Sequence, residues 1–124
     1  MEMRVKTTDY EMTSETKAYL EEKIASIEKL LSSDAETARC EVEVGRAVGS
    51  SQQGNVWRAE FIVMSKGERW VAEAMGESVN AAIDVAKDEI LQQIRKDKGR
   101  DTTLVRRMGA RLKRWAQRGD MRSY

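Results

Sequence analysis

Residues 57–74, WRAEFIVMSKGERWVAEA, decide the fold of this 124-residue chain. From Trp57 to Val63 every second residue is apolar, and these residues alternate with Arg58, Glu60 and Ile62. This period of two is typical of a half-buried β-strand. Lys66-Gly67 then provides a turn, and residues 69–74 return as an antiparallel strand. The stretch therefore predicts the centre of an antiparallel sheet.

Two further strands are predicted on the N-terminal side of this hairpin. Residues 39–44 alternate in the same way, with Cys40, Val42 and Val44 on the apolar face. GSSQQG at 49–54 is long enough to connect this strand to the next one. Residues 3–7 predict a short first strand, because Met3 and Val5 alternate with Arg4 and Lys6.

Two amphipathic helices complete the pattern. Thr13 or Ser14 can cap the first helix and Ser78 the second, because their side-chain oxygens accept from free backbone N–H groups. The first helix has an apolar stripe at helical spacing, made of Leu20, Ile24, Ile27 and Leu31. The second has another, made of Ala82, Ile83, Ala86, Ile90 and Ile94.

The predicted order is β-α-β-β-β-α, an α+β fold in which two helices pack on one face of a four-stranded sheet. We expect one domain over residues 1–100. Residues 101–124 form a basic tail that is either an amphipathic helix or unfolded.

The composition argues against an enzyme. Histidine is absent, which removes the commonest general base and metal ligand. Cys40 is the only cysteine, so it has no partner within the chain for a disulfide or a cysteine-based metal cage, and we expect it to be a small buried apolar residue. We therefore expect no catalytic residues, no metal and no cofactor. The N-terminus has no apolar signal segment and no long apolar run follows, which favours the cytoplasm.

The net charge of +1 conceals two regions of opposite sign. Residues 1–94 contain 11 lysines and arginines against 18 acidic residues, a net charge of −7. Residues 95–124 contain 11 lysines and arginines against 3 aspartates, a net charge of +8. This asymmetry predicts a folded body whose basic end binds a polyanion.

The second helix contains a recognisable segment at residues 81–100, AAIDVAKDEILQQIRKDKGR. AAID followed by QIRK-x-K at this spacing resembles the second helix of the family of ribosome hibernation promoting factors and ribosome-associated inhibitors. The family is also described as sigma-54 modulation protein-like, or as ribosomal subunit interface proteins. The strand order, the first helix and the Gly76-Glu77 step into the second helix are also similar. The resemblance covers roughly residues 1–100.

The resemblance implies a domain that is similar in outline to double-stranded RNA-binding modules. It implies a translation inhibitor that binds the small ribosomal subunit and its ribosomal RNA, in the channel of messenger and transfer RNA, during stress or stationary phase. Whole ribosomes are a further expected partner. We expect no binding to membranes or DNA, and a monomer off the ribosome. The chain is similar to the family's short class, in which some members promote ribosome pairing and others hinder it; the sequence leaves this open.

The candidate RNA-binding residues are basic side chains on the two helices, because lysine and arginine neutralise phosphates and release condensed counterions. They are Lys23, Lys87, Arg95, Lys96, Lys98 and Arg100. The family often has basic residues where this chain has Glu89 and Gln92, so most of the weight falls on Lys87 and the Arg95–Arg100 cluster. Recognition would proceed by shape and backbone, with little reading of bases.

The tail offers a second set of contacts, at Arg106, Arg107, Arg111, Lys113, Arg114 and Trp115. Trp115 could stack on a base or anchor a helix against protein. An alternative function follows from this segment: a protein–protein adaptor whose basic, tryptophan-containing tail docks an acidic partner. Co-sedimentation with ribosomes at low salt would distinguish the two functions.

Overall fold

The computed structural model describes the backbone of residues 1–47 and 56–117, and side chains in the same ranges up to Lys98. The predicted loop at 49–54 therefore lies outside the described residues. Seven elements follow one another along the chain: β1 (Glu2–Thr8), α1 (Ser14–Leu31), the 3₁₀ helix η1 (Ser32–Thr37), β2 (Arg39–Arg46), β3 (Trp57–Ser65), β4 (Glu68–Gly76) and α2 (Val79–Gln117). The predicted order β-α-β-β-β-α is confirmed.

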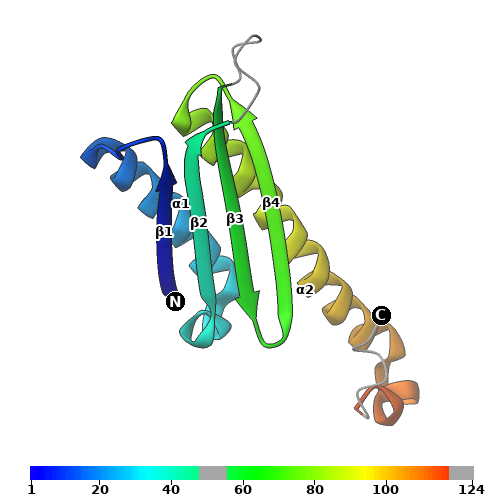
Figure 1. The fold of residues 1–124 in the computed structure, drawn as a ribbon. Coiled ribbons are helices and arrows are strands. Elements are labelled where there is room, and N and C mark those ends of the chain that lie inside the picture. Colours follow the sequence, from blue (N-terminus) through cyan, green and yellow to red (C-terminus); the bar gives the residue numbers. More distant parts are fainter. Residues whose placement is uncertain (48–55, 118–124) are drawn as a thin grey trace.

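The four strands form one sheet in the order β1-β2-β3-β4 (Figure 1). β2, β3 and β4 are antiparallel neighbours, as the hairpin pattern predicts. β1 pairs with β2 in parallel, with Val5 opposite Val42. A parallel pair needs a crossover connection, and α1 with η1 provides it.

Two glycines occupy positions that a larger residue would not tolerate. Lys66 and Gly67 both have positive φ, 49° and 82°, which suits the two-residue connection between β3 and β4. At Gly45 a Cβ atom would lie 2.1 Å from the backbone oxygen of Thr8 on β1. The close approach of β1 to β2 at this end of the sheet therefore requires glycine.

Both predicted helix caps are confirmed. The hydroxyl of Thr13 accepts a hydrogen bond from the backbone N–H of Thr16 at 3.1 Å. The hydroxyl of Ser78 accepts one from the backbone N–H of Ala81 at 3.0 Å. Each satisfies a donor that a helix N-terminus otherwise leaves free, typically worth about 1 kcal/mol.

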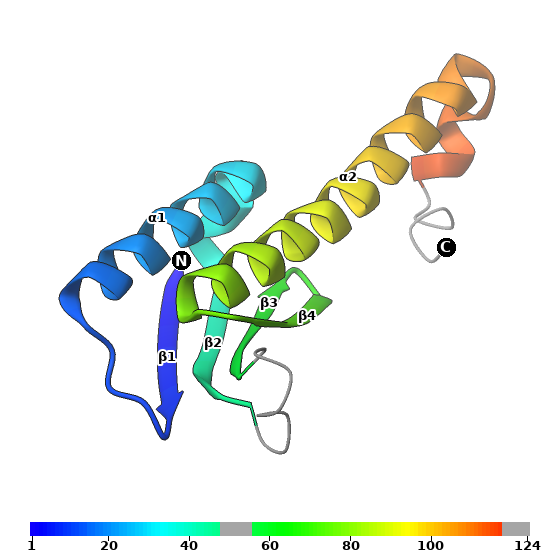
Figure 2. The ribbon, with the colours of Figure 1, turned by 90° about the horizontal axis from the view of Figure 1, so that it is seen from above.

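The two helices lie on the same face of the sheet, with α1 beside α2 (Figure 2). Both predicted stripes are buried, since Leu20, Ile24, Ile27 and Leu31 on α1 and the five predicted residues on α2 are at most 4% exposed. They pack against the inner face of the sheet, with Phe61 at 0% exposure on its central strand. Removing such a side chain typically costs about 2–5 kcal/mol, so this core fixes the position of both helices.

Two features differ in degree from the sequence pattern. Met3 and Val5 share one face of β1, yet each is 40% exposed, because β1 is an edge strand that the core covers only in part. Helix α2 continues to Gln117 and extends past the β3–β4 turn (Figure 1). The boundary between domain and tail at residue 100 stays a prediction.

Candidate nucleic-acid interface

Five of the six candidate RNA-binding residues lie on described parts of the two helices. Lys23 is on α1, and the other four, all on α2, are Lys87, Arg95, Lys96 and Lys98. The side chain of Arg100 lies outside the described residues. So do the side chains of the six tail candidates, Arg106, Arg107, Arg111, Lys113, Arg114 and Trp115.

Lys23 faces α2 and is surrounded by its own partners. Its side chain is 17% exposed, and its Nζ lies 4.4 Å from the centre of the Tyr19 ring. The same Nζ donates to Glu22 Oε1 at 3.2 Å and lies 3.9 Å from Asp84 Oδ1. The ammonium group is therefore already in contact with two carboxylates and an aromatic ring.

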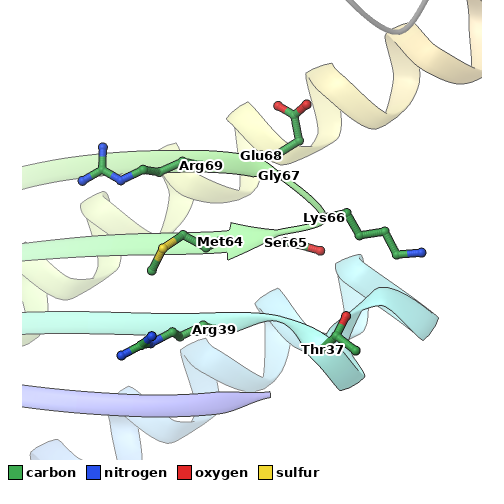
Figure 3. Close-up of a pocket in the computed structure, with 8 residues that line it drawn as sticks. All are labelled: Thr37, Arg39, Met64, Ser65, Lys66, Gly67, Glu68 and Arg69. Carbon is green, nitrogen blue, oxygen red and sulfur yellow. The ribbon is translucent and has the colours of Figure 1, made fainter. Parts of the chain in front are cut away.

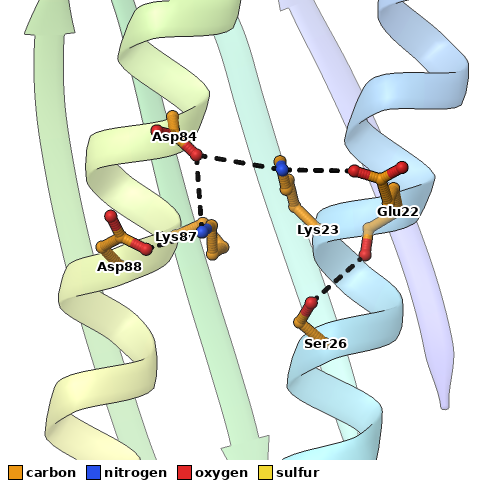
Figure 4. A network of polar contacts seen from close by, with 6 residues as sticks. All are labelled: Glu22, Lys23, Ser26, Asp84, Lys87 and Asp88. Carbon is orange, nitrogen blue, oxygen red and sulfur yellow. Dashed lines mark hydrogen bonds and ion pairs between the residues drawn. The ribbon is translucent and has the colours of Figure 1, made fainter.

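Lys87, on α2, is also held by carboxylates, which lie on its own helix. Its side chain is 13% exposed, and its Nζ donates to Asp88 Oδ1 at 2.6 Å and lies 3.4 Å from Asp84 Oδ1. The hydrogen bond to Asp88, followed by the charges of Asp88 and Asp84, raises the pKa of Lys87 above its usual 10.5, although partial burial opposes the shift. Figure 4 shows Asp84 between the two lysines.

We call Glu22, Lys23, Asp84, Lys87 and Asp88 the interhelical cluster. It contains two cations and three carboxylates, so its net charge is −1. Sequence spacing shows the Asp84–Lys87 pair, which is an i,i+3 neighbour on one helix. Sequence spacing does not show the contact of Lys23 with Asp84, because it depends on how α1 packs beside α2.

Arg95 and Lys96 differ from Lys23 and Lys87 in their surroundings. Both side chains are exposed, and neither makes an ion pair or hydrogen bond with any residue whose side chain is described. Lys98, two residues on, is half-buried and has a partner of its own. Arg95 and Lys96 are thus exposed cations, and no carboxylate of the described part of the chain has to be displaced before they bind an anion.

Asp97 interrupts this basic run, but its carboxylate is turned toward the sheet. It accepts a hydrogen bond from the indole Nε1 of Trp70 on β4 at 2.7 Å. One helical turn earlier, Gln93 Nε2 donates to the backbone oxygen of Val71 at 2.8 Å. These two bonds attach α2 to β4 directly beside Arg95 and Lys96, so the exposed cations are carried by a fixed segment of helix.

The net charge of the helix layer changes sign at Arg95. α1 together with α2 up to Ile94 contains seven carboxylates and four lysines, a net charge of −3. The next four residues, RKDK at 95–98, carry +2. A polyanion is therefore repelled by most of the helix layer and attracted to the far part of α2.

The opposite face of the sheet carries mixed charges that are largely matched. Arg58 contacts three glutamates: Glu43 at 3.6 Å, Glu60 at 3.4 Å, and Glu73. The hydrogen bond to Glu73 is the main reason that the pKa of Arg58 is raised. Cross-strand pairing thus accounts for the charge of Arg58, and we assign no site on this face.

A hollow of about 390 Å³ lies where β3 turns into β4. In Figure 3, Arg39 and Arg69 extend on either side of Met64. Arg39 lies 3.4 Å from Glu41, and Lys66, at the turn, lies 3.3 Å from Asp34. Two of the three cations that line this hollow are thus paired with carboxylates, while Arg69 is exposed.

Other parts of the described chain add no competing chemistry. Cys40 is fully buried, as predicted, and burial raises the pKa of its thiol to about 12, so it is a poor nucleophile. Among the described residues no group of histidine, cysteine and acidic side chains could hold a metal ion. No described helix is long and apolar enough to cross a membrane.

Two solved structures have a fold similar to that of this chain. The N-terminal domain of Protein Y from Thermus thermophilus superposes with a TM-score of 0.63 at 23% identity, over 77% of this chain and 98% of that domain. A ribosomal subunit interface protein from Coxiella burnetii superposes with a TM-score of 0.64 at 11% identity, over 80% of this chain and 99% of that one. A search of curated proteins finds no match. At these identities the structures show a shared fold.

The family assignment comes from the sequence model. The model described as Sigma 54 modulation protein / S30EA ribosomal protein matches residues 3–102. These residues include β1 from Met3 onward and all later described strands and helices up to the exposed cations of α2. The family is ribosome-associated. The resemblance seen in the sequence is confirmed, and the chain belongs to the Sigma 54 modulation protein / S30EA ribosomal protein family.

Proposed function

We propose that this protein is a ribosome hibernation factor that binds the small ribosomal subunit and inhibits translation on idle ribosomes, in stress or stationary phase. In this proposal it contacts ribosomal RNA and occupies the channel of messenger and transfer RNA. The single observation that supports it best concerns Arg95 and Lys96. Both are exposed, have no partner among the residues whose side chains are described, and lie on a helix that Trp70 and Asp97 hold in place. Such a role would place the protein in the cytoplasm.

The chemistry of these residues suits the RNA backbone. Arginine presents a planar fork of donors that matches two phosphate oxygens, and lysine supplies a compact charge. Both neutralise phosphate and release condensed counterions, a gain that does not depend on base sequence. Because α2 is fixed against β4, little conformational freedom is lost when they bind.

Lys98 and Arg100 extend the same segment of α2 and belong to the proposed binding surface. Lys23 and Lys87 contribute less in this proposal, because each already contacts carboxylates in the interhelical cluster. Residues 101–124 would follow the RNA path beyond the domain. If the domain boundary at residue 100 is right, a chain truncated after Arg100 retains binding to the subunit.

Sedimentation with purified small ribosomal subunits tests the proposal. We expect the protein to move with the subunit at 50 mM salt. If four to five phosphates are neutralised, its affinity should fall on the order of a hundredfold or more by 200 mM salt. Addition of the protein should also inhibit cell-free translation. Failure to sediment with ribosomes, or binding that salt leaves unchanged, would contradict RNA-phosphate binding. Loss of binding on truncation would instead make the tail the main anchor.

A further inference from the structure

We propose that Asp84 limits the RNA affinity of this protein by holding Lys23 and Lys87 away from phosphate. The inference rests on the proposed function, and it adds a residue that acts against binding. Asp84 would work as a positioning residue: it touches the two lysines and never the RNA. Its removal should therefore expose a second pair of cations beside the first.

The geometry singles out one oxygen atom. Oδ1 of Asp84 lies 3.9 Å from Nζ of Lys23 on α1 and 3.4 Å from Nζ of Lys87 on α2 (Figure 4). Both lysine side chains are largely covered, at 17% and 13% exposure, while that of Asp84 is 45% exposed. Asp84 is thus the one carboxylate of the cluster that both lysines share, in addition to the shorter contact that each makes with its own partner, Glu22 or Asp88.

The charges of the cluster explain why phosphate does not simply join it. A phosphate in hydrogen-bonding contact with either ammonium group would lie roughly 5 Å from carboxylates that already neutralise that group, and like charges at this range repel. The cluster as a whole has a net charge of −1, so it does not attract a polyanion. Replacing Asp84 by a neutral residue brings this net charge to zero and frees both lysines from their shared partner.

The other two carboxylates of the cluster are less suited to this role. Within the cluster, the Glu22 carboxylate contacts Lys23 and the Asp88 carboxylate contacts Lys87. They are 72% and 64% exposed, so each can swing into solvent when a phosphate approaches its lysine. Of the three carboxylates in the cluster, Asp84 is the one whose contacts include a lysine of the neighbouring helix, so Lys23 loses an interhelical contact if it leaves Asp84 for RNA.

The test compares Asp84→Asn with the wild-type chain in binding to purified small ribosomal subunits. We expect binding on the order of fivefold tighter at 100 mM salt, since two further cations become available. The salt dependence should steepen by one to two phosphates, about 0.9 in logarithmic slope for each. Glu89→Gln is the matched control: it removes the same charge from an exposed position of α2 that pairs with neither lysine among the described residues. It should change affinity much less.

A second measurement identifies the cause. In the Asp84→Asn background, Lys23→Ala together with Lys87→Ala should abolish the gain in affinity and the extra salt dependence. Asp84→Ser repeats the test if Asn distorts the helix pair, and urea unfolding checks that each variant folds. A gain no larger than that of Glu89→Gln, or one that survives removal of both lysines, overturns the inference. If neither the wild-type chain nor the Asp84 variants bind subunits, the proposed function itself is wrong and the inference falls with it.

Discussion

The helix layer carries two groups of cations that look alike in sequence and differ in their surroundings. Lys23 and Lys87 are largely covered, and three carboxylates contact them. Arg95 and Lys96 lie two turns farther along α2, are exposed, and have no partner among the residues whose side chains are described. The difference shows that basic residues of the same type can be neutralised or left exposed, according to the contacts that the fold gives them.

The role of the acidic residue Asp97 also depends on its contacts in the fold. In the sequence it weakens the basic run RKDK, since it lies between Lys96 and Lys98. In the fold its carboxylate accepts from the indole of Trp70 and holds α2 against β4. It therefore positions its basic neighbours.

The largest effect should come from the exposed group. Changing Arg95, Lys96, Lys98 and Arg100 together to alanine should weaken binding to small subunits on the order of a hundredfold and abolish inhibition of cell-free translation, because most of the neutralised phosphates lose their partner. The fold should persist, since none of the described members of this set belongs to the core. Equilibrium binding at 100 mM salt measures the loss. Unchanged inhibition would contradict the proposed binding surface.

The next largest effect should come from the hydrogen bond between Asp97 and Trp70, which attaches α2 to β4 beside the exposed cations. Asp97→Ala leaves the buried Trp70 indole without its acceptor, and an unsatisfied buried donor costs about 1–3 kcal/mol of unfolding free energy. Urea unfolding followed by fluorescence measures it. Glu89→Ala, on the exposed side of α2, is the matched control and should change stability by less than about 0.5 kcal/mol. Equal effects of the two changes would mean that Asp97 does not hold the helix.

Removing the lysines of the interhelical cluster should change the affinity for small subunits much less. Lys23→Ala combined with Lys87→Ala in the wild-type chain should weaken subunit binding by less than about threefold, because both lysines are already neutralised. Titration of both variants at the same salt concentration makes the comparison direct. A loss approaching that of the quadruple variant would reverse the order of the two groups.

The smallest effect is the dependence of stability on pH at Lys87. Its pKa is raised in the folded protein, so its ion pairs stabilise the fold fully below about pH 10.5, and this contribution is lost as pH rises through the folded-state pKa. Solvent screening keeps it small: Lys87→Gln should cost less than about 1 kcal/mol near pH 7. Urea unfolding of both chains at pH 7, 9 and 11.5 should show the difference shrinking only at the highest pH. A difference constant across this range would argue against the ion pairs.

Much of the fold could be predicted because its signals are local. The alternation in residues 57–74, the Lys66-Gly67 turn and the caps at Thr13 and Ser78 each depend on neighbouring residues, and the structure confirms them. The parallel pairing of β1 with β2 was not predicted, because it joins segments more than 30 residues apart. The partial exposure of Met3 and Val5 follows from the same long-range arrangement.

The sequence by itself determined which residues are basic, where the chain changes sign, and which family it belongs to. Only the tertiary structure decided which of those cations are free. Lys23 meets Asp84 because α1 packs beside α2, and Asp97 meets Trp70 because α2 crosses β4. The physical reason is that electrostatic interactions depend on distance in space, and packing brings together charges that lie far apart along the chain.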